Sequence, residues 1–175
     1  MIKKATKSDI DAVAECYREL LEYEEQNGSN SNWVKNLYPT RSVAEEAEGE
    51  GTLYVVEEEG KICGSVILNH FQPEGYKKME WGIEAEGDEV LVIHTLCIPP
   101  SMAGKGYGRK IMGFALDLAK ELGCRTIRLD TYTGNVPAAS LYKKLGYRLV
   151  GETSFMLHGI IEEELKIFEL ILSDK

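Results

Sequence analysis

The stretch that decides the fold reads Leu96-Cys97-Ile98-Pro99-Pro100-Ser101-Met102-Ala103-Gly104-Lys105-Gly106-Tyr107-Gly108-Arg109. It runs from an apolar strand through a glycine-rich loop into the start of a helix. Such a loop presents successive backbone N–H groups at a helix N-terminus, where the partial positive charge favours anions. Glycine also lets the backbone turn tightly and approach a ligand without a Cβ in the way. The stretch therefore predicts a phosphate site, although glycines at a strand-to-helix turn can serve chain geometry alone.

The charge of the chain is divided unevenly along its length. The formal net charge of −9 argues against general binding of nucleic acid. Residues 99–148 carry +6, and the remainder therefore carries −15. A basic segment around the glycine loop suits a small polyanion. The acidic remainder is either a solvated surface, as blocks of like charge usually are, or a surface that suits a cationic second substrate.

Length and composition restrict the class of protein. A chain of 175 residues is expected to form one domain, residues 1–175, that buries a real core. The N-terminus lacks the apolar segment of a secretory signal, and no apolar run is long enough to span a bilayer. The four cysteines are widely separated and form no Cys-x-x-Cys pair, so we expect reduced thiols and no metal site. These features predict a cytoplasmic protein without nucleic-acid or membrane partners.

Hydrophobic periodicity and turn residues predict a mixed α/β domain with helices packed on a central sheet. Ser8 is expected to cap the first helix and Asn135 a short later one, while Gly64 suggests a bulge inside its strand. Strands and helices alternate in the middle of the chain, as in a parallel crossover. Helices are expected at residues 8–27, 42–50, 107–122 and 135–145, and strands at 2–5, 53–57, 62–71, 78–83, 89–98, 126–132, 147–156 and 163–172.

Two familiar phosphate-binding motifs do not fit the glycine loop. A nucleoside-triphosphate P-loop needs Gly-Lys followed by Ser or Thr, whereas Gly106 is followed by a tyrosine. A dinucleotide fold needs Gly-x-Gly-x-x-Gly after its first strand, and the loop here has another spacing and lies in the middle of the chain.

A second motif makes the ligand of the loop more specific. It reads Asn135-Val136-Pro137-Ala138-Ala139-Ser140-Leu141-Tyr142-Lys143-Lys144-Leu145-Gly146-Tyr147. Together the two stretches closely resemble the GNAT superfamily of acyl-CoA-dependent N-acetyltransferases, whose phosphate loop reads Gln/Arg-x-x-Gly-x-Gly/Ala. Its glycines match Gly106 and Gly108, whereas Ala103 replaces the usual Gln or Arg. The resemblance implies a mostly antiparallel sheet of about seven strands flanked by about four helices.

The resemblance also implies a reaction and its cofactor. Acetyl-CoA would be the co-substrate, and a primary amine of a small molecule or peptide would attack it directly in a ternary complex. A non-catalytic acyl-CoA binding or sensing module and an O-acetyltransferase are the alternatives. Leu96 and Ile98 would offer backbone groups to the pantetheine arm, as an added strand does. The expected cofactor-binding residues are Leu96, Cys97, Ile98, Ala103, Gly104, Lys105, Gly106, Tyr107, Gly108, Arg109, Asn135 and Tyr142.

The same resemblance supplies candidates for proton transfer. Tyr142 would lie near the CoA sulfur and protonate the departing thiolate. His94 is either the group that removes the amine proton, as a histidine does in the arylalkylamine branch, or a hydrogen-bonded core residue. Direct transfer needs no nucleophilic cysteine, and Cys97 in its apolar strand is expected to be a core residue.

The acceptor side carries weaker signals. Trp33 and Tyr38 lie in a polar loop, where aromatic residues either contact a substrate or form a lid over the core. Glu80 is a further candidate for contact with the acceptor. Edge strands in the C-terminal half could pair two subunits as a homodimer.

Overall fold

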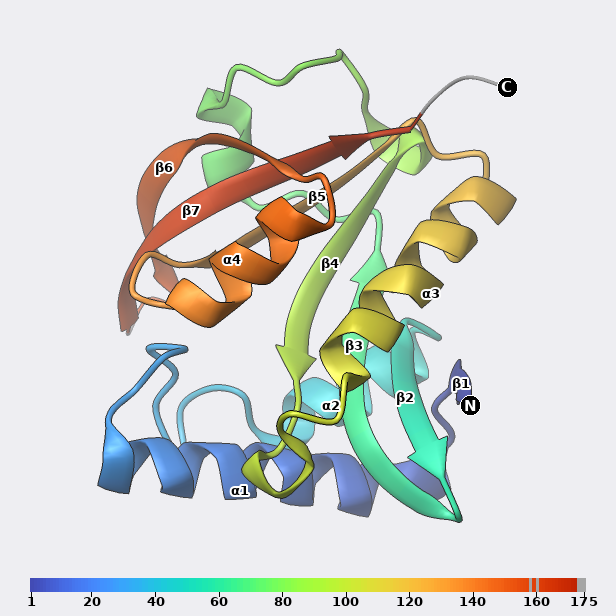
Figure 1. The fold of residues 1–175 in the computed structure, drawn as a ribbon, viewed down its shortest axis with the longest axis vertical. Helices are drawn as coiled ribbons and strands as arrows, with labels where there is room; N and C mark the ends of the chain where they lie inside the picture. The colour runs from blue at the N-terminus through green and yellow to red at the C-terminus, as the bar shows by residue number, and fades with distance from the viewer. Residues whose placement is uncertain (158, 160, 173–175) are drawn as a thin grey trace. The chain divides into compact units, whose positions relative to one another are not determined.

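The computed structural model describes residues 1–157, 159 and 161–172 and has a mixed α/β fold (Figure 1). Its α-helices are α1 (Ile10–Asn27), α2 (Arg41–Gly49), α3 (Tyr107–Glu121) and α4 (Val136–Lys144). Its strands are β1 (Ile2–Lys4), β2 (Leu53–Glu58), β3 (Lys61–Asn69), β4 (Val90–Cys97), β5 (Thr126–Tyr132), β6 (Arg148–Leu157) and β7 (Ile161–Ile171). Seven strands and four α-helices in the described residues confirm the predicted class.

The strands form a sheet in the order β1-β2-β3-β4-β5-β7-β6. β4 and β5 pair in parallel, with α3 as the crossover between them, and the pairs β1–β2, β2–β3, β5–β7 and β6–β7 are antiparallel. The chain divides into two compact units. The first contains residues 1–29, 33–68 and 94–115, and the second contains residues 30–32, 69–93 and the chain from Leu116 onward.

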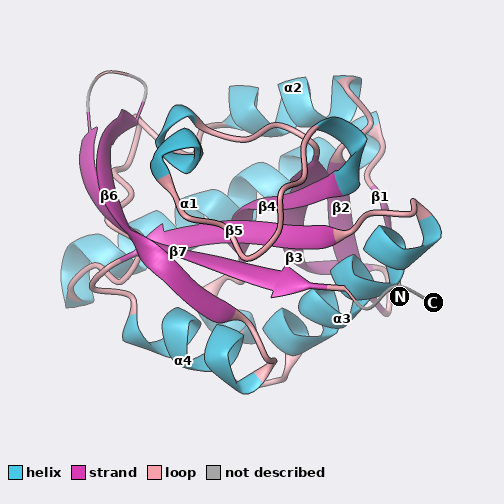
Figure 2. Cartoon of the chain, turned by 90° about the horizontal axis from the view of Figure 1, so that it is seen from above, coloured by secondary structure: helices cyan, strands magenta, loops and turns pink. Residues whose placement is uncertain are grey.

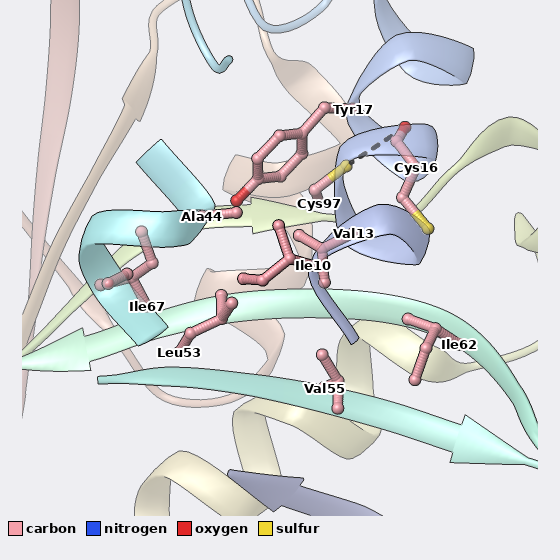
Figure 3. Packing of buried hydrophobic residues seen from close by; sticks show 11 residues of the cluster. Ile10, Val13, Cys16, Tyr17, Ala44, Leu53, Val55, Ile62, Ile67 and Cys97 are labelled. Carbon is pink, nitrogen blue, oxygen red and sulfur yellow. Dashed lines mark hydrogen bonds between the residues drawn. The ribbon is translucent and has the colours of Figure 1, made fainter. Parts of the chain in front are cut away.

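In the first unit, α1 and α2 pack over one face of β2 and β3. Figure 3 shows Leu53 and Val55 of β2 pointing toward this core, which α1 lines with Ile10 and Val13. On the opposite face, Tyr54 packs against Phe114 of α3 with ring centroids 5.3 Å apart. Because both faces are covered, β2 is apolar at consecutive positions, as a buried strand should be.

In the second unit, β5, β7 and β6 are neighbours, with α4 on one face and residues 72–88 on the other (Figures 1 and 2). Tyr142 of α4 packs on Phe168 of β7, with ring centroids 5.6 Å apart. On the other face, the guanidinium of Arg128 lies 3.9 Å from the centroid of the Trp81 ring. The strand predicted at residues 78–83 is wrong, because this segment packs its side chains onto the sheet and does not pair with it.

Local signals in the sequence were partly correct. The cap at Ser8 is wrong: a short 3-10 helix precedes α1, and the carboxylate of Asp9 accepts a hydrogen bond from the Thr6 N–H at 2.8 Å. The cap at Asn135 is confirmed, since its side chain accepts from the Ala138 N–H. The pairing of β2 with β3 shifts beside Gly64, which confirms the predicted bulge.

Candidate active site

The glycine loop and the first turn of α3 form an open cradle of backbone amides. Gly104 and Gly106 have φ angles of 75° and 83°, a left-handed conformation that glycine adopts without a steric penalty. A Cβ on either glycine would meet no atom within 4 Å, so the space in front of the loop is open. The first N–H groups of α3 lack carbonyl partners within the helix. Together these groups provide donors for an anion at the helix N-terminus.

Two carboxylates hold this loop from opposite ends, and the sequence contains no signal for either contact. Glu58 of β2 accepts hydrogen bonds from the Tyr107 hydroxyl at 2.7 Å and from Lys110 Nζ at 2.8 Å. Glu19 of α1 accepts from the N–H and the hydroxyl of Ser101, at 2.7 and 3.1 Å. The buried side chain of Tyr107 is therefore an anchor, and only its backbone N–H remains for a ligand.

The side chains around the cradle fit an anionic group. Lys105 and Arg109 are exposed, and neither forms a salt bridge with another residue in the part of the chain that the structure describes. Ala103 is exposed and offers only its backbone. Two basic side chains without a salt bridge among the described residues, together with a row of amides, match the charge and the acceptor atoms of a diphosphate.

The end of β4 leaves regular strand geometry immediately before the loop. Thr95 has a φ of 47°, which is strained for a β-branched residue and is typical of functional sites. Its hydroxyl forms a hydrogen bond with the hydroxyl of Tyr38. Tyr38 packs edge-on against Trp33, and Trp33 lies on the core that α1 and α2 cover. Tyr38 thus lies beside the distorted end of β4, and Trp33 packs against both Tyr38 and the core.

Exposure alternates along this end of β4. His94, Leu96 and Ile98 are half-buried, whereas Thr95 and Cys97 are buried. The Sγ of Cys97 lies 3.8 Å from the carbonyl oxygen of Cys16 (Figure 3), and burial raises the pKa of this thiol well above its ordinary value. Cys97 is therefore a protonated core residue, and any contact it makes with a ligand comes from its backbone.

Gly64 of β3 sets the position of this strand end, which leads to a first prediction. A Cβ at Gly64 would lie 2.6 Å from Ile98 Cδ1 and 3.1 Å from the carbonyl oxygen of Cys97. The Ile98 side chain can rotate, but the Cys97 carbonyl must shift. We expect Gly64→Ala to lower the free energy of unfolding by about 1–2 kcal/mol, measured by urea denaturation.

Gly113→Ala is the matched control, because a Cβ there meets nothing within 4 Å in the interior of α3. This substitution should raise the stability by up to about 1 kcal/mol. Equal stability of the two variants would contradict the assigned approach of β3 to the end of β4.

The second unit carries Tyr142 and Asn135. Tyr142 is buried on α4, and its ring packs between Phe168 and Tyr147. Burial raises the pKa of its hydroxyl, and the charge of Asp130 raises it further, so the O–H keeps its proton at neutral pH. Asn135 uses its side-chain oxygen to cap α4, which leaves its amide N–H₂ for another partner.

Glu80 belongs to an acidic pocket in the second unit. The pocket has a volume of about 650 Å³, and four glutamates line it together with Trp81 and Arg128, namely Glu80, Glu84, Glu86 and Glu89. The exposed Glu80 carboxylate thus lies among like charges. Among the described residues, no group of three or more His, Cys, Asp or Glu side chains could hold a metal ion. No α-helix in the described ranges is both long and apolar enough to cross a membrane.

Comparisons with known proteins agree with this geometry. The sequence model of the Acetyltransferase (GNAT) family matches residues 13–147. An uncharacterized N-acetyltransferase of Methanocaldococcus jannaschii is 27% identical over 150 residues, which are 83% of this chain and 59% of that protein. The thialysine N-epsilon-acetyltransferase of Sus scrofa is 25% identical over 174 residues, covering 94% of this chain and 96% of that protein.

A solved structure extends the likeness to the fold. The yncA protein of Salmonella typhimurium, solved with its cofactor acetyl-CoA, superposes with a TM-score of 0.69 and 19% identity over 100% of this chain and 95% of its own. The chain therefore belongs to the GNAT acetyltransferase family, whose members use acetyl-CoA. It spans little more than half of the length of the archaeal relative.

Proposed function

We propose that the chain transfers an acetyl group from acetyl-CoA to a primary amine of a small molecule or peptide. The observation that carries the proposal is the open amide cradle at Gly104, Gly106 and the start of α3, with the exposed basic side chains of Lys105 and Arg109 beside it. These residues fit the diphosphate of CoA. The relative from Sus scrofa carries an amine substrate in its name, which supports an amine as the acceptor.

The chain's own residues would provide binding and proton transfer. Acetyl-CoA supplies the thioester carbonyl carbon that the amine attacks. An amine with a pKa near 10 is free of its extra proton in only about one molecule in a thousand at pH 7, so a base is needed. His94 or a water chain takes that proton, backbone N–H groups at the distorted end of β4 stabilise the carbonyl oxygen, and the Tyr142 O–H protonates the thiolate as the C–S bond breaks.

Release of free thiol from acetyl-CoA with a panel of primary amines tests the proposal. Turnover that depends on an amine supports it. Tight binding of acetyl-CoA by calorimetry, without turnover of any amine, would favour the non-catalytic binding module instead. Turnover with hydroxyl acceptors alone would point to O-acetylation.

A second prediction concerns the affinity of the glycine loop for acetyl-CoA. Gly106→Ala places a Cβ at a φ of 83° in the space that the diphosphate would enter. We expect the Kd for acetyl-CoA, measured by calorimetry, to rise about tenfold, because the amides at the helix N-terminus can no longer approach the anion closely.

The matched control is Gly87→Ala in the second unit. Gly87 also has a positive φ, 57°, and open space around its Cβ position, so the strain of the new side chain is similar. Its Kd for acetyl-CoA should equal that of the unmodified protein. A similar loss of affinity for acetyl-CoA in both variants would exclude the glycine loop as the binding site of the cofactor.

A further inference from the structure

Two carboxylates of the second unit lie in the fold without a basic partner. Glu163 of β7 is 5% exposed, and its Oε1 has no hydrogen-bond partner among the described residues. Asp130 of β5 is half-buried. Neither carboxylate forms a salt bridge within the described ranges. A buried carboxylate without a partner is costly, so this pair needs an explanation beyond packing.

The strand register places both carboxylates on the same face of the sheet. Asp130 pairs with Ile167 of β7, and Leu165 and Glu163 follow Ile167 at alternate positions. Alternate residues of a strand point to the same side, and Glu163 is buried whereas its neighbours Glu162 and Glu164 are exposed. This is the face of β5 and β7 that residues 72–88 cover.

Tyr76 fixes one oxygen of Asp130 and leaves the other open. The buried Tyr76 hydroxyl donates to Asp130 Oδ2 at 2.7 Å. Tyr76 is itself held, because its carbonyl oxygen accepts from Trp81 Nε1 at 3.0 Å and Trp81 stacks on Arg128. Within the described residues, Asp130 Oδ1 accepts no hydrogen bond. A rigid carboxylate with a free oxygen is suited to bind a donor.

The charges around the two carboxylates leave room for one more cation. Burial raises the pKa of Asp130 to about 6, which the Tyr76 hydrogen bond partly opposes. Burial and the charge of Asp130 raise the pKa of Glu163 to about 7. The other titratable groups near these carboxylates are Tyr76, Tyr142 of α4, and the cluster of Arg128, Glu169 and Arg148. Both tyrosines are neutral, and Glu169 faces two arginines, Arg128 and the exposed Arg148. With Asp130 and Glu163 the group therefore has two positive and three negative charges, and one bound cation would balance it.

We propose that Asp130 and Glu163 bind an ammonium or guanidinium group of the acceptor, and that the acceptor is a small molecule with two basic nitrogens. The inference rests on the proposed acetyl transfer. An ammonium nitrogen bound to these carboxylates keeps its proton and has no lone pair for attack on the thioester. The bound group is therefore an anchor, and a second amine of the same molecule reacts. Of the two carboxylates, only Glu163 belongs to the acidic remainder outside residues 99–148.

The test compares 1,4-diaminobutane with 1-aminobutane, two acceptors that share a four-carbon chain and differ in the second amine. In acetyl-transfer assays at pH 8, we expect kcat/KM to be at least about tenfold higher for the diamine, as a charge-assisted bond to a carboxylate predicts. Glu163→Gln and Asp130→Asn should each raise KM for the diamine about tenfold and reduce this preference. The side chain introduced by Asp130→Asn would still offer an oxygen to the Tyr76 hydroxyl, so this variant should fold normally. It therefore tests the site even if Glu163→Gln fails to fold.

Glu164→Gln is the matched control, because it removes the same charge from an exposed neighbour on the same strand. It should leave KM for both amines unchanged. Equal values for diamine and monoamine in the unmodified protein, or equal effects of Glu163→Gln and Glu164→Gln, would overturn the anchor site.

Binding of 1,4-diaminobutane in the presence of coenzyme A, measured by calorimetry, tests the anchor site independently of acetyl transfer. Affinity should fall at least about tenfold between pH 8 and pH 5, because protonation of Asp130 and Glu163 removes the charge that holds the cation. Binding that requires Glu163, without thiol release from acetyl-CoA, would retain the site but refute the transferase. Binding of Mg²⁺ or Ca²⁺ alone, with no diamine binding, would refute the anchor.

Discussion

Replacement of Tyr142 by phenylalanine is expected to lower kcat for acetyl transfer about a hundredfold, at the low end of general-acid effects. The substitution removes only the hydroxyl oxygen. The ring keeps its edge-on contact with Phe168, at 5.6 Å between centroids, so α4 should stay in place. KM for acetyl-CoA should change by less than about twofold, because the lost interaction would act in the transition state.

The protonation state of Tyr142 supports this expectation. Its buried hydroxyl has a raised pKa, first because of burial and then because of the negative charge of Asp130. The hydroxyl is therefore a donor throughout the neutral range. The kcat of the unmodified enzyme should show no loss from Tyr142 ionisation below pH 9, measured as initial rates of thiol release.

Tyr147→Phe provides the control for Tyr142→Phe. Tyr147 is also buried, lies 6.2 Å from Tyr142 between ring centroids, and has a hydroxyl without a hydrogen-bond partner among the described residues. Loss of this hydroxyl should leave kcat unchanged and should not lower stability, since it removes an unsatisfied buried group. Equal loss of kcat in both variants, or full activity of Tyr142→Phe, would exclude Tyr142 as the acid.

The fold was accessible from the sequence because its main signals are local. The strand predicted at residues 126–132 has the same bounds in the structure, since Ile127 and Leu129 alternate with polar residues and a glycine precedes the strand closely. The helix after the glycine loop begins at Tyr107 as predicted. Glycine turns and helical periodicity act within a few residues of each other, so a single sequence contains them.

The acidic part of the site was not accessible in this way. Glu163 lies in the run Glu162-Glu163-Glu164, which looks like a solvated segment, and only strand pairing determines which of the three is buried. Arg128 and Asp130 are two residues apart on β5 and so lie on one face of the strand. These two charged residues were the available sign in the sequence that this face is not purely apolar. The segment over that face was mistaken for a strand because its attachment depends on distant contacts, above all those of Arg128.

Arg128 should therefore be the residue of the second unit whose loss costs the most stability. It is 1% exposed, its Nε donates to Glu169 Oε2 at 3.1 Å, and its two terminal nitrogens donate to Gln72 Oε1 and the Ile83 carbonyl at 2.8 and 2.9 Å. Arg128→Met preserves much of the volume but takes the buried guanidinium from Glu169, whose remaining charged partner is the exposed Arg148 at 3.6 Å. We expect a loss of about 3–5 kcal/mol in the free energy of unfolding, measured by urea denaturation.

Two further variants show whether the loss of stability in Arg128→Met comes from the buried ion pair or from lost packing. Arg125→Met removes a half-exposed arginine that lies 3.6 Å from Glu89, and such surface pairs contribute less than about 1 kcal/mol. The double variant Arg128→Met/Glu169→Leu removes both buried charges and should regain most of the loss, because the main cost in the single variant is a buried carboxylate that has lost its buried guanidinium. A double variant as unstable as the sum of its parts would contradict that cause. Even when stable, it should bind the diamine more weakly. Trp81 loses the guanidinium on which it stacks, and Trp81 holds Tyr76, which donates to Asp130.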